Sequence, residues 1–194
     1  MELVLIRHAL PLRVEGVSGT PADPALSEQG RLQVERLQRW LEGERIDAIY
    51  ASPLRRAQET AAPLAAERGL EIVVEPGIAE FDRDSESYVP LEELKAENRA
   101  HWKELVDGGM YASLDIDAFR RTVVEAVERI VAAHARQRVA LVCHGGVINA
   151  WAAHVLGVER PVFFEPGYTS LHRFLAASSG ERSVLSLNEV AHLR

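Results

Sequence analysis

The residues best suited to chemistry in this sequence are an arginine and a histidine that follow its first apolar segment. Residues 3–6 read Leu-Val-Leu-Ile, which is typical of a short strand buried on both faces, and Arg7 and His8 come directly after it. In an open parallel sheet, ligands bind just beyond the carboxyl ends of the strands. A guanidinium beside an imidazole at that place suits an anionic substrate together with a nucleophile or a proton carrier. Taken alone, the pair could equally be ordinary surface residues at the end of a strand.

A second histidine stands in the same kind of place. The apolar run 139–143 is followed by His144 and two glycines, after which a helix is expected. Glycines there let the backbone approach a ligand closely, and a helix N-terminus favours an anion. A pair of cations, Arg55 and Arg56, lies in the first turn of another expected helix. Because neighbouring helical residues diverge by about 100°, only one arginine of the pair needs to face the site.

The elements that must position these residues alternate along the chain. Helices are expected from Ser27 as N-cap to a stop at Gly43, from Ser52 as N-cap to about Arg68, over about 117–136 and over 147–156. Pro63 is expected to kink or split the second of these helices. The remaining apolar segments predict strands, some of the later ones antiparallel, over 3–6, 46–51, 70–74, 139–143, 162–164, 170–175 and 183–187. This alternation predicts an α/β three-layer sandwich with a mostly parallel central sheet flanked by helices.

One region breaks the alternation. Residues 76–90 form a polar loop that contains Glu80, Asp82 and Asp84, and residues 91–106 are helical in character. We interpret the region from about 76 to 115 as an inserted helical region over the active-site end of the sheet, within a single domain of residues 1–194. The two aspartates are expected to be solvated loop charges.

The composition excludes several classes of function. The chain has 194 residues and a formal net charge of −7, which argues against nonspecific binding of nucleic acid. Its single cysteine, Cys143, excludes an intramolecular disulfide and a Cys-rich metal site. No apolar run is long enough to span a bilayer and no signal peptide is visible, so the cytoplasm is the expected location. Cys143 and the tryptophans Trp40, Trp102 and Trp151 are expected in the core.

Four segments resemble, in order, those of the histidine phosphatase superfamily, the phosphoglycerate mutase-like proteins. Arg7-His8 is similar to the opening Arg-His-Gly motif, and residues 52–61, SPLRRAQETA, are similar to the segment Ser-Pro-Leu-x-Arg-Ala-x-x-Thr-Ala. Residues 78–80, Ile-Ala-Glu, resemble the segment that holds the acid, and residues 143–146, Cys-His-Gly-Gly, resemble the second histidine motif. The order and spacing match across most of the chain, which makes the set far more specific than any single motif.

The resemblance implies a role for each matching residue. His8 would be the nucleophile that becomes a phosphohistidine, and Glu80 would protonate the leaving alcohol and then activate water. Arg7, Arg56 and His144 would hold the phosphoryl group, Arg56 being the arginine that precedes the alanine of the family pattern. Such a site needs mainly positioning and positive charge around the phosphoryl oxygens. Neither a metal nor another cofactor is expected.

The sequence departs from the family pattern around the expected phosphate site. Ala9 replaces the usual glycine, Val14 stands where a phosphate-binding Asn is frequent, and Tyr168 lies in a segment where many members carry Asn. Ser18 or Thr20 is a candidate to supply a hydroxyl in place of that Asn. These departures bear on the choice of substrate more than on the phosphoryl chemistry.

Three functions follow from the resemblance. The leading hypothesis is a metal-independent phosphatase that hydrolyses a small phosphate monoester. The first alternative is a phosphoglycerate mutase-type transfer, although such mutases tend to be longer, with a tail that closes the site. The second is a catalytically silent phosphoryl-binding regulatory protein, against which the presence of both His8 and Glu80 weighs. The expected partner is a small phosphate ester, with no nucleic acid and no membrane, and a homodimer is left open.

Overall fold

A six-stranded sheet runs through the middle of the computed structural model, which describes residues 1–15, 19–90, 93, 115–160 and 162–194. In spatial order the strands are β3 (Ile72–Val74), β2 (Ala48–Ala51), β4 (Arg138–Cys143), β1 (Glu2–Arg7), β5 (Leu171–Ala176) and β6 (Arg182–Glu189). The first four run parallel to one another, β5 is antiparallel to β1, and β6 is antiparallel to β5. The predicted mostly parallel sheet with late antiparallel strands is therefore confirmed.

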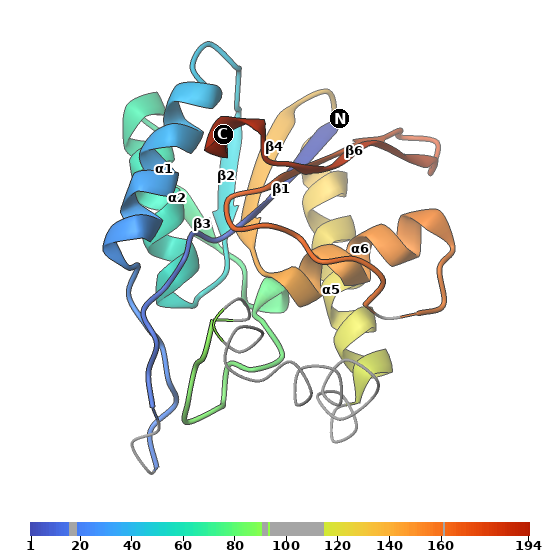
Figure 1. Ribbon diagram of the computed structural model, residues 1–194. Coiled ribbons are helices and arrows are strands. Elements are labelled where there is room, and N and C mark those ends of the chain that lie inside the picture. The colour runs from blue at the N-terminus through green and yellow to red at the C-terminus, as the bar shows by residue number, and fades with distance from the viewer. Residues whose placement is uncertain (16–18, 91–92, 94–114, 161) are drawn as a thin grey trace.

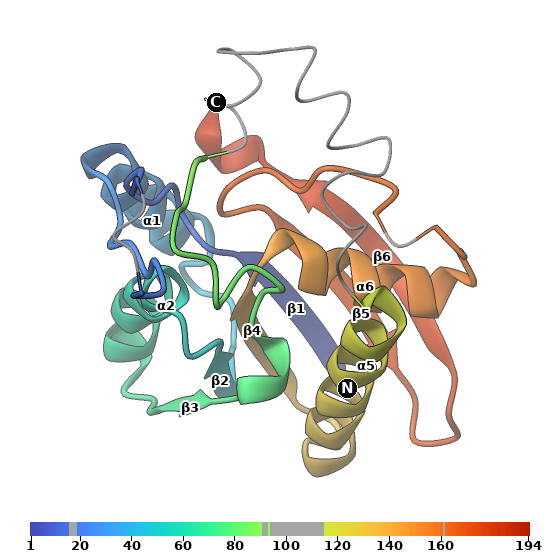
Figure 2. The same ribbon diagram turned by 90° about the horizontal axis from the view of Figure 1, so that it is seen from below.

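Helices cover both faces of this sheet, as Figures 1 and 2 show. Helices α1 (Glu28–Trp40) and α2 (Arg55–Arg68) lie on one face, and α5 (Ile116–Ala133) and α6 (Gly145–Leu156) lie on the other. Two short 3-10 helices, η1 (Pro76–Ile78) and η3 (Ala191–Leu193), complete the regular elements in the described ranges. The three-layer α/β sandwich predicted from the sequence is the observed fold.

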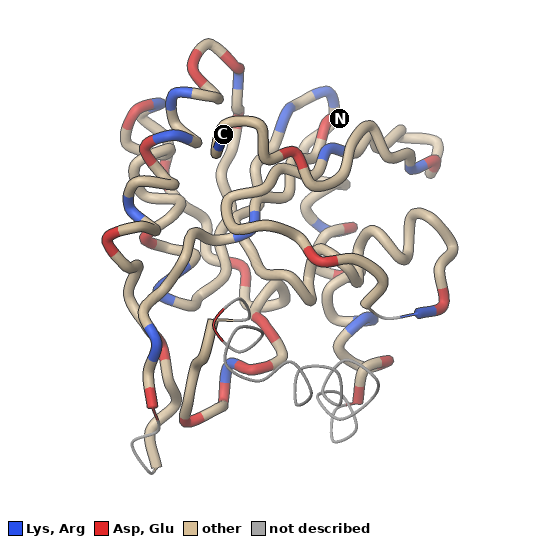
Figure 3. The backbone as a smooth tube through the Cα atoms, in the orientation of Figure 1, with Lys and Arg blue, Asp and Glu red and all other residues tan. Residues whose placement is uncertain are grey.

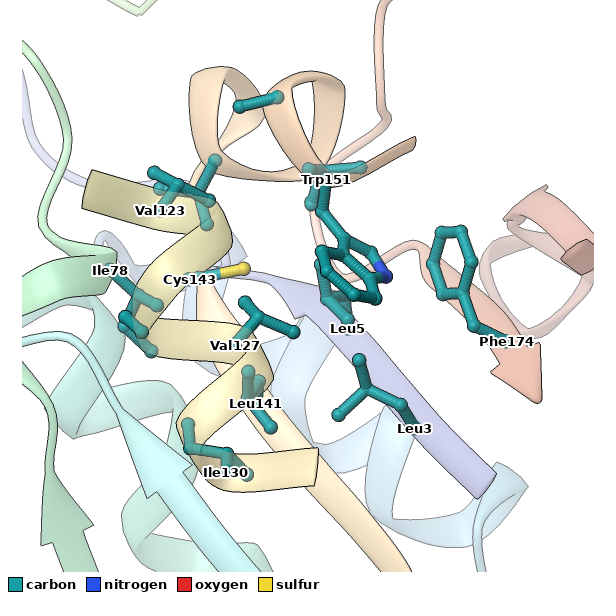
Figure 4. Packing of buried hydrophobic residues seen from close by; sticks show 14 of the residues in the cluster. Leu3, Leu5, Ile78, Val123, Val127, Ile130, Leu141, Cys143, Trp151 and Phe174 are labelled. Atoms are coloured by element: carbon teal, nitrogen blue, oxygen red, sulfur yellow. The ribbon is translucent and has the colours of Figure 1, made fainter. Parts of the chain in front are cut away.

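The apolar strands β1 and β4 are buried because each supplies side chains to both layers. In β1, Leu3 and Leu5 pack with Trp151 of α6 in the cluster that Figure 4 shows. The alternate residues Val4 and Ile6 pack on the opposite face, against residues of α1 and α2. A strand with two buried faces has no solvent-facing positions, which explains the uninterrupted apolar runs in its sequence.

The loop that follows β1 is fixed against α1. The Ser27 hydroxyl caps this helix as predicted, since it accepts a hydrogen bond from the Gly30 N–H at 3.0 Å. The same hydroxyl donates to the Leu10 carbonyl oxygen at 2.9 Å. A Cβ at Gly30 would lie 2.1 Å from that oxygen, so only glycine permits this close approach. The chain is thus held in place directly after His8.

The start of α2 differs from the prediction. The helix begins at Arg55 with Leu54 as N-cap and without a side-chain cap, rather than with Ser52 capping it. The Ser52 hydroxyl is hydrogen-bonded to His144 Nε2 at 2.7 Å and accepts from the Leu54 N–H at 3.3 Å, so it joins a tertiary contact and lies just before the helix rather than capping it. The helix does not split at Pro63, because α2 continues through this residue to Arg68; the alternative, a kink at Pro63, stays a prediction.

Two further predictions were wrong. Residues 162–164 are not a strand: the Phe163 and Phe164 N–H groups donate to Asn149 Oδ1 at 3.0 and 3.3 Å, and this side chain takes the place of a neighbouring strand. Trp40 is 46% exposed at the end of α1, while Trp151 is fully buried as predicted. Cys143 is buried, which confirms its assignment to the core.

The described part of the expected insertion, residues 76–90, lies along the loop that follows β1. The Ala22 N–H donates to the Ser85 carbonyl oxygen at 2.7 Å, and Val14 and Tyr88 exchange two backbone hydrogen bonds of 2.8 and 2.9 Å. Apart from residue 93, the predicted helical region 91–106 lies outside the described residues, as do Trp102 and Ser18. The single domain of residues 1–194 with its insertion at about 76–115 stays a prediction.

Acidic and basic residues are interspersed along the outer helices and loops, as Figure 3 shows. Within the described ranges, no helix combines the length and the apolar character that crossing a bilayer requires.

Candidate active site

The carboxyl ends of three neighbouring parallel strands bring the predicted site residues together. His8 follows β1 and donates its backbone N–H to the Cys143 carbonyl oxygen at 2.9 Å, at the end of β4. Ser52 follows β2 and donates its N–H to the Val142 carbonyl oxygen at 3.0 Å. His144 follows β4, and the centroids of its ring and the His8 ring lie 5.1 Å apart. The histidine that follows each buried strand therefore reaches one shared site, as the sequence predicted.

His8 is held as a neutral imidazole with its proton on Nδ1. Its Nδ1 lies 2.8 Å from the Ala9 carbonyl oxygen, and because a carbonyl can only accept, Nδ1 carries the proton and Nε2 carries the lone pair. Burial holds the pKa of His8 well below its usual value, and the charges of Arg56 and Arg7 lower this pKa further. An unprotonated Nε2 is the form that can attack an electrophile.

Two buried guanidinium groups lie at the site. The Arg7 Nη1 donates to the Pro166 carbonyl oxygen at 2.5 Å, and its Cζ lies 3.9 Å from the centre of the Tyr168 ring. Arg56 extends from the first turn of α2, and its Cζ lies 4.7 Å from the centre of the Tyr88 ring. Aromatic faces of this kind stabilise a cation and fix the plane of a guanidinium.

The structure distinguishes between the two neighbouring arginines of α2. The Arg56 side chain is 1% exposed and points into the site, whereas the Arg55 side chain is 58% exposed and pairs with Glu59. Their divergence is the one expected for consecutive residues of a helix. The choice of Arg56 as the arginine at the site agrees with this geometry.

His144 is the second buried histidine of the site, beside His8 and the two arginines. Burial lowers the pKa of His144 well below its usual value, and the charges of Arg56, His8 and Arg7 lower it further. Its Nδ1 is buried without a hydrogen-bond partner in the described part of the chain, and so are the Nε atoms of Arg7 and Arg56. Buried polar groups are normally hydrogen-bonded, so these three unmet nitrogens, two of which belong to the guanidinium groups, are suited to the oxygens of a small anion.

Glu80 supplies a buried carboxyl group at the same site. Its Oε2 accepts from the Gly146 N–H at 2.8 Å, and its Oε1 accepts from the Phe81 N–H at 3.1 Å. Burial raises the pKa of Glu80 to about 7, and the nearby charge of Asp82 adds to this rise. The carboxyl group can therefore give up and take back a proton near neutral pH. A Cβ at Gly146 would lie 2.3 Å from Oε1, so this glycine makes room for the acid.

One charged residue of the site, Asp82, was not predicted from the sequence. Asp82, which was expected to be a solvated loop charge, pairs with Arg56 through Oδ1 and Nη2 at 2.9 Å. Asp84 is 85% exposed and pairs with Arg83, as expected of a solvated residue. The sequence offers one signal for Asp82: it lies two residues after Glu80 in the same polar loop. Thr20, one of the two candidate hydroxyl donors, is exposed.

Metal-ligating side chains do not cluster in the part of the chain that the structure describes: no group of three or more His, Cys, Asp or Glu residues there could hold an ion. The site combines two guanidinium groups, two imidazoles whose pKa values are lowered and one carboxyl group whose pKa is raised to about 7. Such a set of groups has the chemical capacity to bind a small anion, to attack an electrophile and to transfer a proton.

Comparisons with known proteins identify the family. The chain belongs to the histidine phosphatase superfamily (branch 1), whose sequence model matches residues 3–189. Phosphoserine phosphatase 1 of Hydrogenobacter thermophilus is 30% identical over 208 aligned positions, which cover 100% of this chain and 94% of that protein. A probable phosphoglycerate mutase of Erwinia tasmaniensis is 25% identical, over 81% of this chain and 76% of that protein.

The fold is shared with solved structures. The structure of a mycobacterial glucosyl-3-phosphoglycerate phosphatase superposes with a TM-score of 0.77 at 22% identity, over 97% of this chain and 99% of that one. The resemblance noted in the four sequence segments is thus confirmed at the level of family and fold.

Proposed function

We propose that this protein is a metal-independent phosphatase that hydrolyses a small phosphate monoester through a phosphohistidine on His8. The observation that carries the proposal is the neutral, buried His8 imidazole with its unprotonated Nε2 beside two buried arginines whose Nε atoms have no partner among the described residues. The family membership and the phosphoserine phosphatase relative support it.

In the first step, His8 Nε2 attacks the phosphorus atom and the bond from phosphorus to the ester oxygen breaks. Arg7, Arg56 and His144 hold the phosphoryl oxygens and stabilise the charge that develops on them. Glu80, whose raised pKa of about 7 leaves a large share of the carboxyl groups protonated at neutral pH, gives its proton to the leaving oxygen. The products of this step are an alcohol and a phosphorylated His8.

In the second step, water attacks the phosphorus atom and the bond from phosphorus to Nε2 breaks. The Glu80 carboxylate left by the first step takes a proton from this water, which restores the acid. Inorganic phosphate leaves, and His8 returns to its neutral form. The Ala9 carbonyl oxygen holds the Nδ1 proton in both steps, so Nε2 remains the reacting nitrogen.

Phosphoglycerate mutase-type transfer is the second candidate, because a relative with that name also matches. A panel of phosphate esters separates the two functions. A phosphatase releases inorganic phosphate from phosphoserine and related small esters, whereas a mutase converts one phosphoglycerate into its isomer with little release of phosphate. Absence of both activities would leave the silent phosphoryl-binding protein. Location in the cytoplasm, a homodimer and the lack of nucleic-acid binding stay predictions.

A further inference from the structure

We infer that Asp82 is an internal anion that occupies part of the phosphate site in the free protein and gives up Arg56 to the incoming phosphoryl group. This inference rests on the proposed function, because it concerns the same anion site. It gives Asp82, which lies outside the four motif segments, control over the affinity for phosphate.

The ion pair lies inside the site rather than on the surface. The Arg56 side chain is 1% exposed, and the Tyr88 ring covers its guanidinium on one face. The Asp82 Oδ1 approaches Arg56 Nη2 at 2.9 Å, at hydrogen-bond distance. A negative oxygen therefore already lies against a guanidinium that we assign to the phosphoryl group.

The Asp82 carboxylate lies at the border between the buried site and solvent. Its side chain is 28% exposed, so it can turn toward water when it leaves the buried arginine. The backbone of its turn is fixed independently of the carboxylate, since the Arg83 N–H donates to the Glu80 carbonyl oxygen at 3.2 Å and the Ser85 N–H donates to the Asp82 carbonyl oxygen at 2.9 Å. Only the side chain of Asp82 has to move, and Glu80 can keep its place.

Binding of a phosphoryl group favours this exchange. A phosphoryl dianion carries more charge than a carboxylate and has enough oxygens to meet the buried Nε atoms of both arginines and Nδ1 of His144. Asp82 beside that dianion would be a like charge in a site of low dielectric, which opposes its remaining there. The carboxylate thus acts as a competitor that the ligand must displace.

The competition weakens the apparent affinity for phosphate. An affinity is reduced by the fraction of molecules in the binding-competent state, so a pair that is open in about one molecule in ten raises the Kd about tenfold. Removal of the carboxylate should therefore tighten binding of inorganic phosphate by about tenfold. A larger effect is expected for Asp82→Ala than for Asp82→Asn, because Asn keeps a neutral acceptor for Arg56.

The test is titration calorimetry of inorganic phosphate into the whole protein and its variants at one pH and one salt concentration. The matched control is Asp84→Asn, which removes the same charge two residues away from an exposed pair. We expect Asp82→Asn and Asp82→Ala to bind phosphate more tightly, and Asp84→Asn to match the wild type within about twofold. Thermal melts establish that each variant is folded.

Unchanged or weaker binding in folded Asp82→Ala, with wild-type affinity in Asp84→Asn, would overturn the inference and make Asp82 a residue that orients Arg56 for phosphate. Equal tightening in Asp84→Asn would also overturn it, because a general charge effect would then explain the result. Failure of phosphate to bind the wild type and every variant would overturn the proposed phosphate site itself. The failure of the inference and that of the proposed function are thus distinguishable.

Discussion

The Glu80→Gln substitution should make the stability of the protein less dependent on pH near neutrality while it removes the proposed acid. Glu80 lies in a buried site that raises its pKa from 4.5 to about 7. The folded protein therefore retains a proton that the unfolded chain releases at lower pH. The free energy of unfolding of the wild type should fall as the pH rises from 4.5 to about 7, and the full cost should be present above that range. Glutamine cannot ionise, so the variant avoids this cost.

The magnitude follows from the size of the shift. One pKa unit corresponds to about 1.4 kcal/mol, so ionising Glu80 in the folded protein costs ~3 kcal/mol. Most of this cost, ~2 kcal/mol, should appear between about pH 5 and about pH 8. The lowered pKa values of His8 and His144 affect stability at acidic pH, but both proteins contain these groups and their contribution cancels in the difference.

Urea denaturation at several values of pH measures this difference directly. We expect the free energy of unfolding of Glu80→Gln, minus that of the wild type, to grow by ~2 kcal/mol across the range. Glu59→Gln is the matched control. Burial alone would raise the pKa of Glu59, but the Leu26 N–H and Arg55 lower this pKa overall. The difference in free energy of unfolding between Glu59→Gln and the wild type should therefore stay constant above about pH 5. Parallel curves for Glu80→Gln and the wild type would refute the raised pKa and, with it, the assignment of Glu80 as an acid at neutral pH.

The other predictions concern catalysis. Glu80→Gln should slow phosphorylation of the protein by roughly a hundredfold or more with alkyl phosphates but only slightly with nitrophenyl phosphate, whose leaving group needs no proton; equal slowing in single-turnover measurements would remove Glu80 from this role. Gly146→Ala should reproduce this dependence on the leaving group in a folded protein, because a Cβ would overlap Glu80 Oε1 at 2.3 Å; unaltered rates with alkyl phosphates would contradict it. A chelator should leave phosphate release unchanged, since the two buried arginines supply the positive charge; loss of activity that one divalent ion restores would favour a metal-dependent hydrolase.

The parts of the fold that the sequence predicted well are those set by local patterns. Residues 3–6 and 139–143 are apolar without interruption because each strand is buried on both faces, and a histidine follows each run. Ser27 caps α1 through a local hydrogen bond that its neighbours in the sequence allow. Parallel strands place their carboxyl ends at one edge of the sheet, so the meeting of His8 and His144 could be expected before the structure was known.

The parts that were not predicted depend on contacts between distant residues. Ser52 has the local pattern of an N-cap, but its hydroxyl bonds to His144, ninety-two positions away. The apolar run 162–164 has the composition of a strand, yet the Asn149 side chain takes its N–H groups. Asp82 and Asp84 look alike in the sequence, and only the course of the loop past α2 shows which of them reaches a buried arginine.

The central claim is that His8 carries the phosphoryl group, and trapping the intermediate tests it most directly. The wild-type protein is mixed briefly with a labelled phosphate ester, quenched with alkali and mapped by mass spectrometry, with folded His8→Ala as the control. We expect an acid-labile phosphoryl adduct on His8 alone, and neither adduct nor turnover in His8→Ala. Turnover by His8→Ala close to that of the wild type, or an adduct on another residue of the wild type, would contradict the account.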